Sequence, residues 1–277
     1  MKIFSIGLLL LILKMPIAFC QTLQNTDSIK RLLMHTQKDT SRILLLVQLA
    51  GNYRFFNPDS SIIIAQQAID LAQMIHFDKG KVRALINYGE TRRFQGEFPQ
   101  ALEAQFNALQ ISKNIDDKDG EAGSLGSIGL VYLELNENRQ AFTYLHQARK
   151  ISEQLSNNLT EGIWLSGIGY GYLKMNILDS ALIFEQQAEA LSNALPVTTA
   201  LKSLILTRLG IIHRKLGHQD LALQYFQDAI KNSYITGDLL NRGRTQYQIA
   251  ELYDSVKQQD SSLHYCHRLL PGNHLFF

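Results

Sequence analysis

A small residue returns along the chain about every 40 positions, and this repeat constrains the fold more than any other feature. The first series, with steps of 40, 40, 40, 41 and 40 residues, is Ser61, Ala101, Ala141, Ala181, Ala222 and Ser262. A series seven positions later is Ala68, Ala108, Ala148, Ala188, Ala229 and Leu269, and one twelve positions earlier is Gly89, Gly129, Gly169, Gly210 and Ala250. Three parallel series with one period indicate an array of similar structural units.

The spacing of apolar residues shows what one unit contains. In Ile128–Leu133 and in Ala141–Ile151 apolar residues lie three and four positions apart, which is typical of an α-helix. Between them, Leu135–Asn138 is a polar interruption of turn length. Each unit is therefore predicted to be two antiparallel helices joined by a short turn. One pair cannot bury both of its apolar faces, so the units are expected to stack around a continuous core in an all-α fold.

The pattern within a unit resembles the tetratricopeptide repeat family. The matching residues of one unit are Ile128, Gly129, Tyr132, Asn136, Ala141, Leu145 and Ala148. Those of two more are Ile168, Gly169, Tyr172, Asn176, Ala181 and Ala188, and Leu209, Gly210, Gly217, Ala222, Phe226 and Ala229. One departure is Glu185, which stands where the family has an aromatic residue. The resemblance covers residues 27–270 and implies a right-handed α-solenoid of about six stacked antiparallel helix pairs.

The expected units are residues 41–70, 81–112, 121–153, 161–193, 201–233 and 242–270, followed by an irregular tail at 271–277. The period is about six residues longer than the family's basic length of about 34. We expect the additional residues to lengthen the end of each second helix and the link that follows, at Asp116–Gly120, Ser156–Asn158 and Thr236–Asp238. This longer form is similar to the sensory region of bacterial two-component histidine kinases that contain such repeats.

The first twenty residues differ from the rest and resemble a secretory signal peptide. Lys2 precedes an uninterrupted run of apolar and small residues at 3–13, which is too short to span a bilayer and suits the central part of a signal sequence. Small residues at Ala18 and Cys20 predict cleavage before Gln21. The alternative is lipidation of Cys20, against which Phe19 argues because that processing requires a small residue before the cysteine. The chain is thus expected to be exported, and periplasmic or secreted.

Charge and cysteine content limit the partners and the means of stabilisation. Removal of Lys2 and Lys14 leaves 25 of the 27 basic side chains, which balances the 25 acidic ones. A balanced chain gives no electrostatic reason to expect nucleic acid as a partner. No second apolar run is long enough to cross a membrane, so the mature chain is not expected to span one. Cys266 is then the only cysteine, which excludes an intrachain disulfide.

No arrangement of residues predicts catalysis, a cofactor or a metal site. The glycines of Gly167–Gly171 and Gly123–Gly129 superficially resemble a dinucleotide-binding loop, but they lie within a predicted helix instead of following a strand. His264, Cys266 and His267 are potential metal ligands, yet residue 266 points away from the face that the two histidines share on a helix. We therefore expect no enzyme activity, no cofactor and no bound metal.

In arrays of this family, binding occurs on the concave face formed by the first helix of each pair. Helical spacing around the packing residues gives a candidate groove with central aromatic residues and cationic residues near both ends. These residues are Arg83, Glu90, Arg93, Tyr170, Lys174, Arg214, Arg244 and Tyr247. Such a surface suits an extended peptide or a partner helix, with arginine binding carboxylates. An ordinary solvated face is the alternative.

Two functions are compatible with these observations. The first is an exported, non-catalytic scaffold that binds a peptide or protein segment in its concave groove. The second, implied by the resemblance, is the sensory input portion of a two-component histidine kinase or transcriptional regulator, associated with a membrane signalling protein. The break in the last repeat at Pro271 would fit a shortened sensor or a unit completed by a partner.

Overall fold

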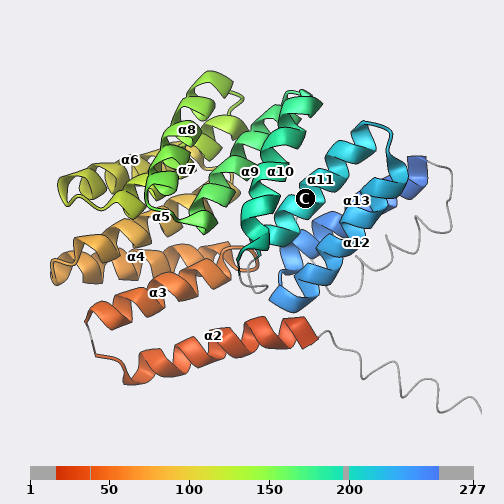
Figure 1. Cartoon of the computed structure of the whole chain (residues 1–277). Coiled ribbons are helices and arrows are strands. Elements are labelled where there is room, and N and C mark those ends of the chain that lie inside the picture. Colours follow the sequence, from red (N-terminus) through yellow and green to blue (C-terminus); the bar gives the residue numbers. More distant parts are fainter. Residues whose placement is uncertain (1–16, 38, 196–199, 256–277) are drawn as a thin grey trace, which may run out of the picture.

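The computed structural model describes residues 17–37, 39–195 and 200–255; 85% of these described residues are helical, and none of them forms a strand. The helices are α2 (Ile17–His35), α3 (Thr40–Tyr53), α4 (Pro58–Met74), α5 (Asp78–Phe94), α6 (Phe98–Asn114), α7 (Lys118–Glu134), α8 (Asn138–Gln154), α9 (Asn158–Lys174), α10 (Leu178–Asn193), α11 (Leu201–Lys215), α12 (Gln219–Thr236) and α13 (Leu239–Ser255). Figure 1 shows them as successive antiparallel pairs that curve into an arc. The predicted all-α superhelix is confirmed.

The small residues of the repeat lie where two helices of a pair approach most closely. Ala101, Ala141, Ala181 and Ala222 are all completely buried. A Cβ added to Gly129 would lie 2.7 Å from Leu145 Cγ, and one added to Gly210 would lie 2.4 Å from the Phe226 ring. Gly129 and Gly210 therefore serve packing between helices. The glycines at 123–129 and 167–171 lie inside α7 and α9, which excludes a dinucleotide-binding loop there.

The links between helices repeat with half the period of the array. Residues with positive φ occur at His76, Gly96, Asp116, Asn136, Ser156, Asn176, Gly217 and Gly237. Each follows the end of a helix, and the next residue donates its backbone N–H five positions back, as Asp117 does to Ser112 O (2.8 Å) and Glu137 to Tyr132 O (2.9 Å). This is the Schellman arrangement, which satisfies the last carbonyl groups of a helix.

The expectation of longer links between pairs is wrong. Residues 118–120 form the first turn of α7 instead of extending a loop, because the left-handed residue at Asp116 reverses the chain within three residues. From α4 to α10 every link has three residues, whether it lies inside a pair or between pairs, whereas the link from α10 to α11 covers residues 194–200. The additional residues of the long period therefore lengthen the helices, most of which have 17 residues.

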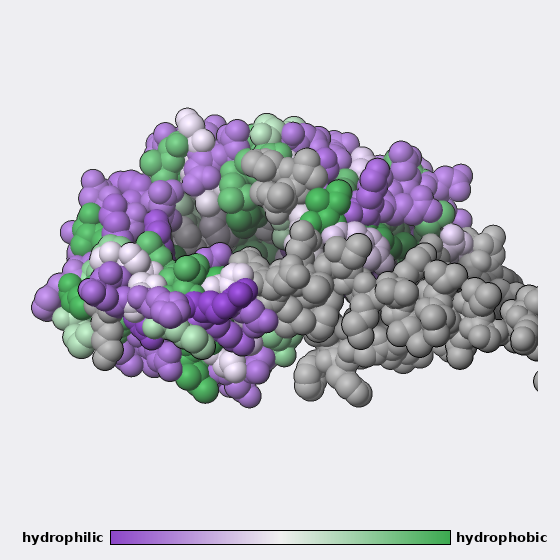
Figure 2. Space-filling view, turned by 90° about the horizontal axis from the view of Figure 1, so that it is seen from below, coloured by the Kyte–Doolittle hydropathy of each residue, from purple (hydrophilic) through white to green (hydrophobic). Residues whose placement is uncertain are grey.

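The first helices of the pairs line the inside of the arc. Helices α3, α5, α7, α9, α11 and α13 each contact the next in this series, whereas α4, α6, α8, α10 and α12 pack on the flanking inner helices. Helix α2 packs on α3 and reaches α12 at the other end of the array. Figure 2 shows a hollow in the surface, bordered by both hydrophobic and hydrophilic residues.

Several expectations concern residues outside the described part of the chain. These are the apolar run at 3–13, the cluster of His264, Cys266 and His267, and the tail at 271–277. Helix α2 begins at Ile17 and continues past the cleavage point predicted before Gln21. In residues 17–37, 39–195 and 200–255, no helix combines the length and the hydrophobicity needed to cross a membrane.

Candidate functional site

An ion-pair network crosses the three inner helices α5, α7 and α9. Arg93 of α5 donates to Glu90 Oε2 over 2.8 Å, and its other terminal nitrogen lies 3.7 Å from Glu134 Oε1 of α7. Lys174 of α9 lies 3.4 Å from the other oxygen of Glu134 and donates to Leu133 O over 2.6 Å. The predicted groove residues Glu90, Arg93 and Lys174 thus belong to one network, in which the carboxylate of Glu134 joins Arg93 to Lys174.

Glu90 holds a charge despite its burial, with only 11% of its side chain exposed. Burial alone raises the pKa of this carboxyl, but the nearby charges of Arg93 and Arg54 outweigh that effect and bring the pKa below its usual value. Arg54, at the end of α3, donates to the side chain of Asn87. The two arginines and Glu90 thus connect the first two inner helices.

Tyr170 forms the middle of the inner wall, with cations from two helices on its ring. The guanidinium of Arg208, from α11, lies 4.7 Å from the ring centroid, within cation–π range. The ammonium group of Lys174, one turn along α9, lies 5.9 Å from the same centroid. Tyr170 therefore holds two positive charges, one from α9 and one from α11, next to its ring.

Arg208 is held by a buried network behind the wall. Its Nη1 donates to Ser166 O and to Ser166 Oγ, each over 2.7 Å, and lies 3.6 Å from Glu185 Oε1. Ser166 Oγ in turn donates to Glu185 Oε2 over 2.7 Å. Burial raises the pKa of Glu185 to about 7, although Arg208 and Ser166 act in the opposite direction. Arg208 therefore faces a carboxyl group that is partly protonated at neutral pH.

Arg244, on α13, approaches the same centre from the far end of the array. Its side chain has an exposed surface, yet desolvation by the protein atoms around it lowers its pKa. Arg208, and more weakly Arg93, lower the pKa further, whereas Tyr170 and Asp238 act to raise it. Arginines of α5, α11 and α13 are thus close enough to repel one another. In the described part of the chain, Arg244 has no hydrogen bond or ion pair.

The remaining predicted groove residues, Arg83, Arg214 and Tyr247, lie on α5, α11 and α13. Arg214 is paired with Glu251 of α13 over 2.7 Å, so its charge is compensated within the inner wall. Tyr247 is 42% exposed on α13. Arg83 is exposed near the start of α5, about ten residues and almost three helical turns before Arg93.

Four residues of the network are not among the predicted ones: Arg54, Glu134, Glu185 and Arg208. A signal for Arg208 exists. Ile211 occupies the repeat position of Tyr170, and Arg208 precedes Ile211 by three positions and so shares its helical face. Glu185 is recognisable as the charged residue at an aromatic position of the repeat. Nothing in the repeat pattern marks Arg54 or Glu134.

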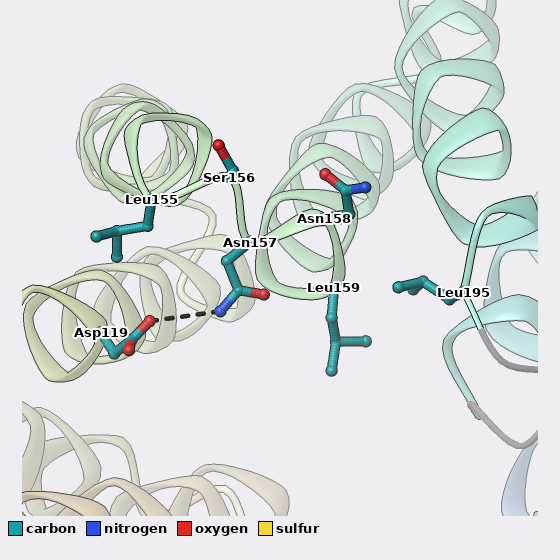
Figure 3. A pocket seen from close by; sticks show the side chains of 7 residues that line it. All are labelled: Asp119, Leu155, Ser156, Asn157, Asn158, Leu159 and Leu195. Carbon is teal, nitrogen blue, oxygen red and sulfur yellow. Dashed lines mark hydrogen bonds between the residues drawn. The ribbon is translucent and has the colours of Figure 1, made fainter.

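Other polar groupings offer less chemistry. A shallow pocket at the α8–α9 turn, separate from the inner face, is lined by Leu159 and Leu195 on two sides (Figure 3). Asn157, which also lines it, donates to Asp119 over 3.4 Å. His213 and His218 bring their Nδ1 atoms within 3.3 Å, and His213 stacks on Tyr225. Within the described ranges, no three histidine, cysteine or acidic side chains are close enough to bind a metal.

Comparisons with known proteins agree with this architecture. Tetratricopeptide repeat family models match residues 80–154 and 204–233. A search of curated proteins gives no significant match. The resemblance of the long-period repeat to the sensory region of histidine kinases is not confirmed by these matches.

Three solved structures illustrate the similarity of fold. The apo form of RapI has 16% identity and a TM-score of 0.63, over 90% of this chain and 89% of that one. A Rap protein in complex with competence and sporulation factor has 15% identity and a TM-score of 0.69, over 92% and 71%. Aspartyl phosphate phosphatase F from Bacillus subtilis has 16% identity and a TM-score of 0.57, over 81% and 70%. The chain is a tetratricopeptide-type repeat protein with an all-α superhelical fold.

Proposed function

We propose that the chain is an exported, non-catalytic scaffold that binds a peptide or protein segment in its concave face. The observation that carries this proposal is the inner wall itself. Six consecutive inner helices contact one another, and four of them carry Arg93, Tyr170, Arg208 and Arg244, which lie within electrostatic range of one another. Tyrosine and arginine are the side chains most often found at the energetic centres of protein interfaces.

Two further observations support binding. The inner wall consists of six helices, each in contact with the next, so it is long enough for an extended segment. The Rap protein solved with competence and sporulation factor has the same fold over 92% of this chain, so the architecture is compatible with ligand capture. The network of Glu90, Arg93, Glu134 and Lys174 keeps the wall rigid, which reduces the entropy lost on binding.

Site-specific photo-crosslinking tests the location of binding. Peptides selected from a displayed library on residues 21–277 are added to the chain carrying p-benzoylphenylalanine at Tyr247, on the inner wall. The control carries it at Ile183, which is 53% exposed on the outer helix α10. Crosslinks from position 247 and not from 183 are expected; equal crosslinking from both would contradict binding in the hollow.

Export rests on the sequence of the first twenty residues. Lys2, the apolar run at 3–13 and the small residues Ala18 and Cys20 support a signal peptide cleaved before Gln21. Residues 1–30 fused to a reporter enzyme that is active only outside the cytoplasm should give activity and a mature N-terminus at Gln21. A mass increase at an N-terminal Cys20 would instead show lipidation, and an uncleaved inactive fusion would contradict export.

A further inference from the structure

The carboxyl group of Glu185 is completely buried and only half satisfied by hydrogen bonds. Its Oε2 atom accepts from Ser166 Oγ over 2.7 Å. Its Oε1 atom is also buried, and it accepts no hydrogen bond from any described residue. A buried polar atom without a partner is costly, and it is more costly when the group carries a charge. The environment of Glu185 is therefore sensitive to whether its carboxyl holds a proton.

Arg208 links this buried carboxyl to the inner wall. Its Nη1 atom lies 3.6 Å from Glu185 Oε1, just beyond hydrogen-bond distance, and this is the ion pair that the described residues give Glu185. The same Nη1 donates to Ser166 O and Ser166 Oγ, each over 2.7 Å. On its other side, the guanidinium lies 4.7 Å from the centroid of the Tyr170 ring. One cation is thus shared between the interior and the wall.

The arrangement around the carboxyl accommodates two protonation states. The Ser166 hydroxyl can donate to an ionised Oε2 or accept from a protonated one, because a hydroxyl does both. Ionisation leaves Oε1 charged and without a donor, and a shift of Nη1 from 3.6 Å to the usual distance of about 2.9 Å would supply one. A neutral carboxyl exerts no such pull on Arg208. Burial raises the pKa of Glu185 to about 7, so both states are populated near neutral pH.

Among the described residues, no second charged group acts on this carboxyl from α9 or α11, the two helices that pack most extensively on α10. Helix α9 contributes the hydroxyl of Ser166, and α11 contributes the guanidinium of Arg208. Glu189 lies one turn further along α10, but its pKa responds to the charges of Lys202 and Asp228. The cluster therefore combines one titrating acid with one cation.

We propose that Ser166, Glu185 and Arg208 form a proton-linked switch, in which the gain or loss of one proton at the buried carboxyl repositions the Arg208 guanidinium against the ring of Tyr170. With the carboxyl protonated, Arg208 rests on Ser166 and the ring, and its charge is uncompensated. With the carboxyl ionised, Arg208 moves toward Oε1 and its charge is paired. The switch is a property of the wall itself and does not depend on what the hollow binds.

Fluorine NMR of the full chain with p-fluorophenylalanine in place of Tyr170 tests the switch, because this ring reports nearby charge and has no phenol group to titrate. Carbon NMR of labelled glutamate carboxyls follows Glu185 in parallel. Glu185→Gln removes the proton site, and Gln105 occupies the equivalent position in the α5–α6 pair. The matched control is Glu189→Gln, which removes a half-buried acid from the same helix whose pKa is also raised. Circular dichroism verifies that the variants are folded.

We expect the ring signal and the Glu185 carboxyl to titrate together, with one midpoint near pH 7. Glu185→Gln and Arg208→Gln should abolish the response of the ring, whereas Glu189→Gln should preserve it. In Arg208→Gln the carboxyl should still titrate, with its midpoint at a higher pH, because Arg208 lowers the pKa of Glu185 in the wild type.

Four results would overturn the switch. The first is a ring signal that does not change between pH 5 and pH 8.5, and the second is a response that survives Glu185→Gln, which would assign it to histidines or other groups. The third is an unchanged carboxyl midpoint in Arg208→Gln. The fourth, clearly different midpoints for the ring and the carboxyl, needs no Glu185 or Arg208 substitution, so the test remains decisive if such a variant does not fold. None of these results bears on peptide binding, which the crosslinking experiment tests separately.

Discussion

The side chain of Glu185 packs directly on Gly169, so that a Cβ added to the glycine would lie 2.9 Å from Glu185 Cγ. The same relationship recurs in three other helix pairs, at Gly89 with Gln105, Gly129 with Leu145, and Gly210 with Phe226. All four partner side chains are completely buried. Among these four side chains, only that of Glu185 can ionise. It occupies a position where the repeat normally has an apolar residue.

The buried carboxyl of Glu185 should make stability depend on pH near neutrality. Its pKa is raised from 4.5 to about 7, so the folded state binds this proton more tightly than the unfolded state. The stabilisation by that proton is complete below about pH 4.5 and is lost as the pH rises through 7. Glu185→Gln should remove the dependence, and the difference between wild type and variant should change by about 3 kcal/mol between pH 5 and pH 8.5.

Urea unfolding at a series of pH values measures this effect. The substitution is structurally compatible, because Gln105 occupies the equivalent position in the α5–α6 pair and donates to Ile86 O over 3.0 Å. The amide introduced by Glu185→Gln should therefore be accommodated without rearrangement, and the variant should be the more stable protein at pH 8.5. A variant whose stability follows wild type in parallel across the range would show that Glu185 does not titrate in the folded state.

Glu90 should show the opposite dependence. The charges of Arg93 and Arg54 outweigh burial and lower its pKa, so its contribution is present above the unfolded value of 4.5 and is lost as the pH falls through the folded value. Glu90→Gln leaves two buried arginines without their carboxylate. We expect a loss of about 3 kcal/mol at pH 7, typical of a broken buried ion pair, and a smaller loss at pH 3.5.

The matched control for Glu90 is Glu134→Gln. Glu134 contacts Arg93 and Lys174 at 3.7 and 3.4 Å, but its side chain is 30% exposed. An exposed pair contributes at most about 1 kcal/mol. Chemical denaturation of both variants at pH 7 and pH 3.5 separates the two cases, and similar losses for the two would refute the assignment of Glu90 as the buried centre of the network.

The sequence predicts the helix pairs well and the centre of the hollow poorly, for a physical reason. The series of small residues that includes Ala141 records contacts between neighbouring helices, and such local packing repeats with the period of the chain. The approach of Arg93 to Arg244 depends on the curvature accumulated over four successive inner-helix contacts, which no single repeat encodes. Glu185 shows the same limit, because its environment depends on Arg208 of the following repeat.

The links between helices should respond to glycine in a predictable way. Ser156 has φ of 53°, a left-handed conformation that disfavours residues with a Cβ, and its side chain is exposed. Ser156→Gly should therefore raise the free energy of unfolding by about 0.5–1 kcal/mol. Gly96→Ala is the reverse experiment at φ of 78°, where a Cβ would meet no atom within 4 Å. It should lower stability by about 1 kcal/mol through backbone strain alone. Thermal unfolding of both variants measures the pair, and the same sign for both would contradict this account.

Gly126 and Gly243, both in inner helices, should respond in opposite directions to the same substitution. A Cβ on Gly126 would lie 2.3 Å from the ring of Trp164, which is 6% exposed, so the ring must move. A Cβ on Gly243 would meet nothing within 4 Å. Gly126→Ala should destabilise by about 1–3 kcal/mol, as overpacked cores do. Gly243→Ala should stabilise by about 1 kcal/mol, because alanine favours the helix.

Trp164 is the single tryptophan of the chain, so its fluorescence reports the packing at Gly126 directly. In folded Gly126→Ala, displacement of the indole from its slot between α7 and α9 should shift the emission maximum to longer wavelength, whereas Gly243→Ala should leave it unchanged. A Gly126→Ala protein with unaltered emission and unaltered stability would mean that α7 and α9 separate freely. The inner wall would then be too compliant to hold Tyr170 and its arginines in a fixed arrangement.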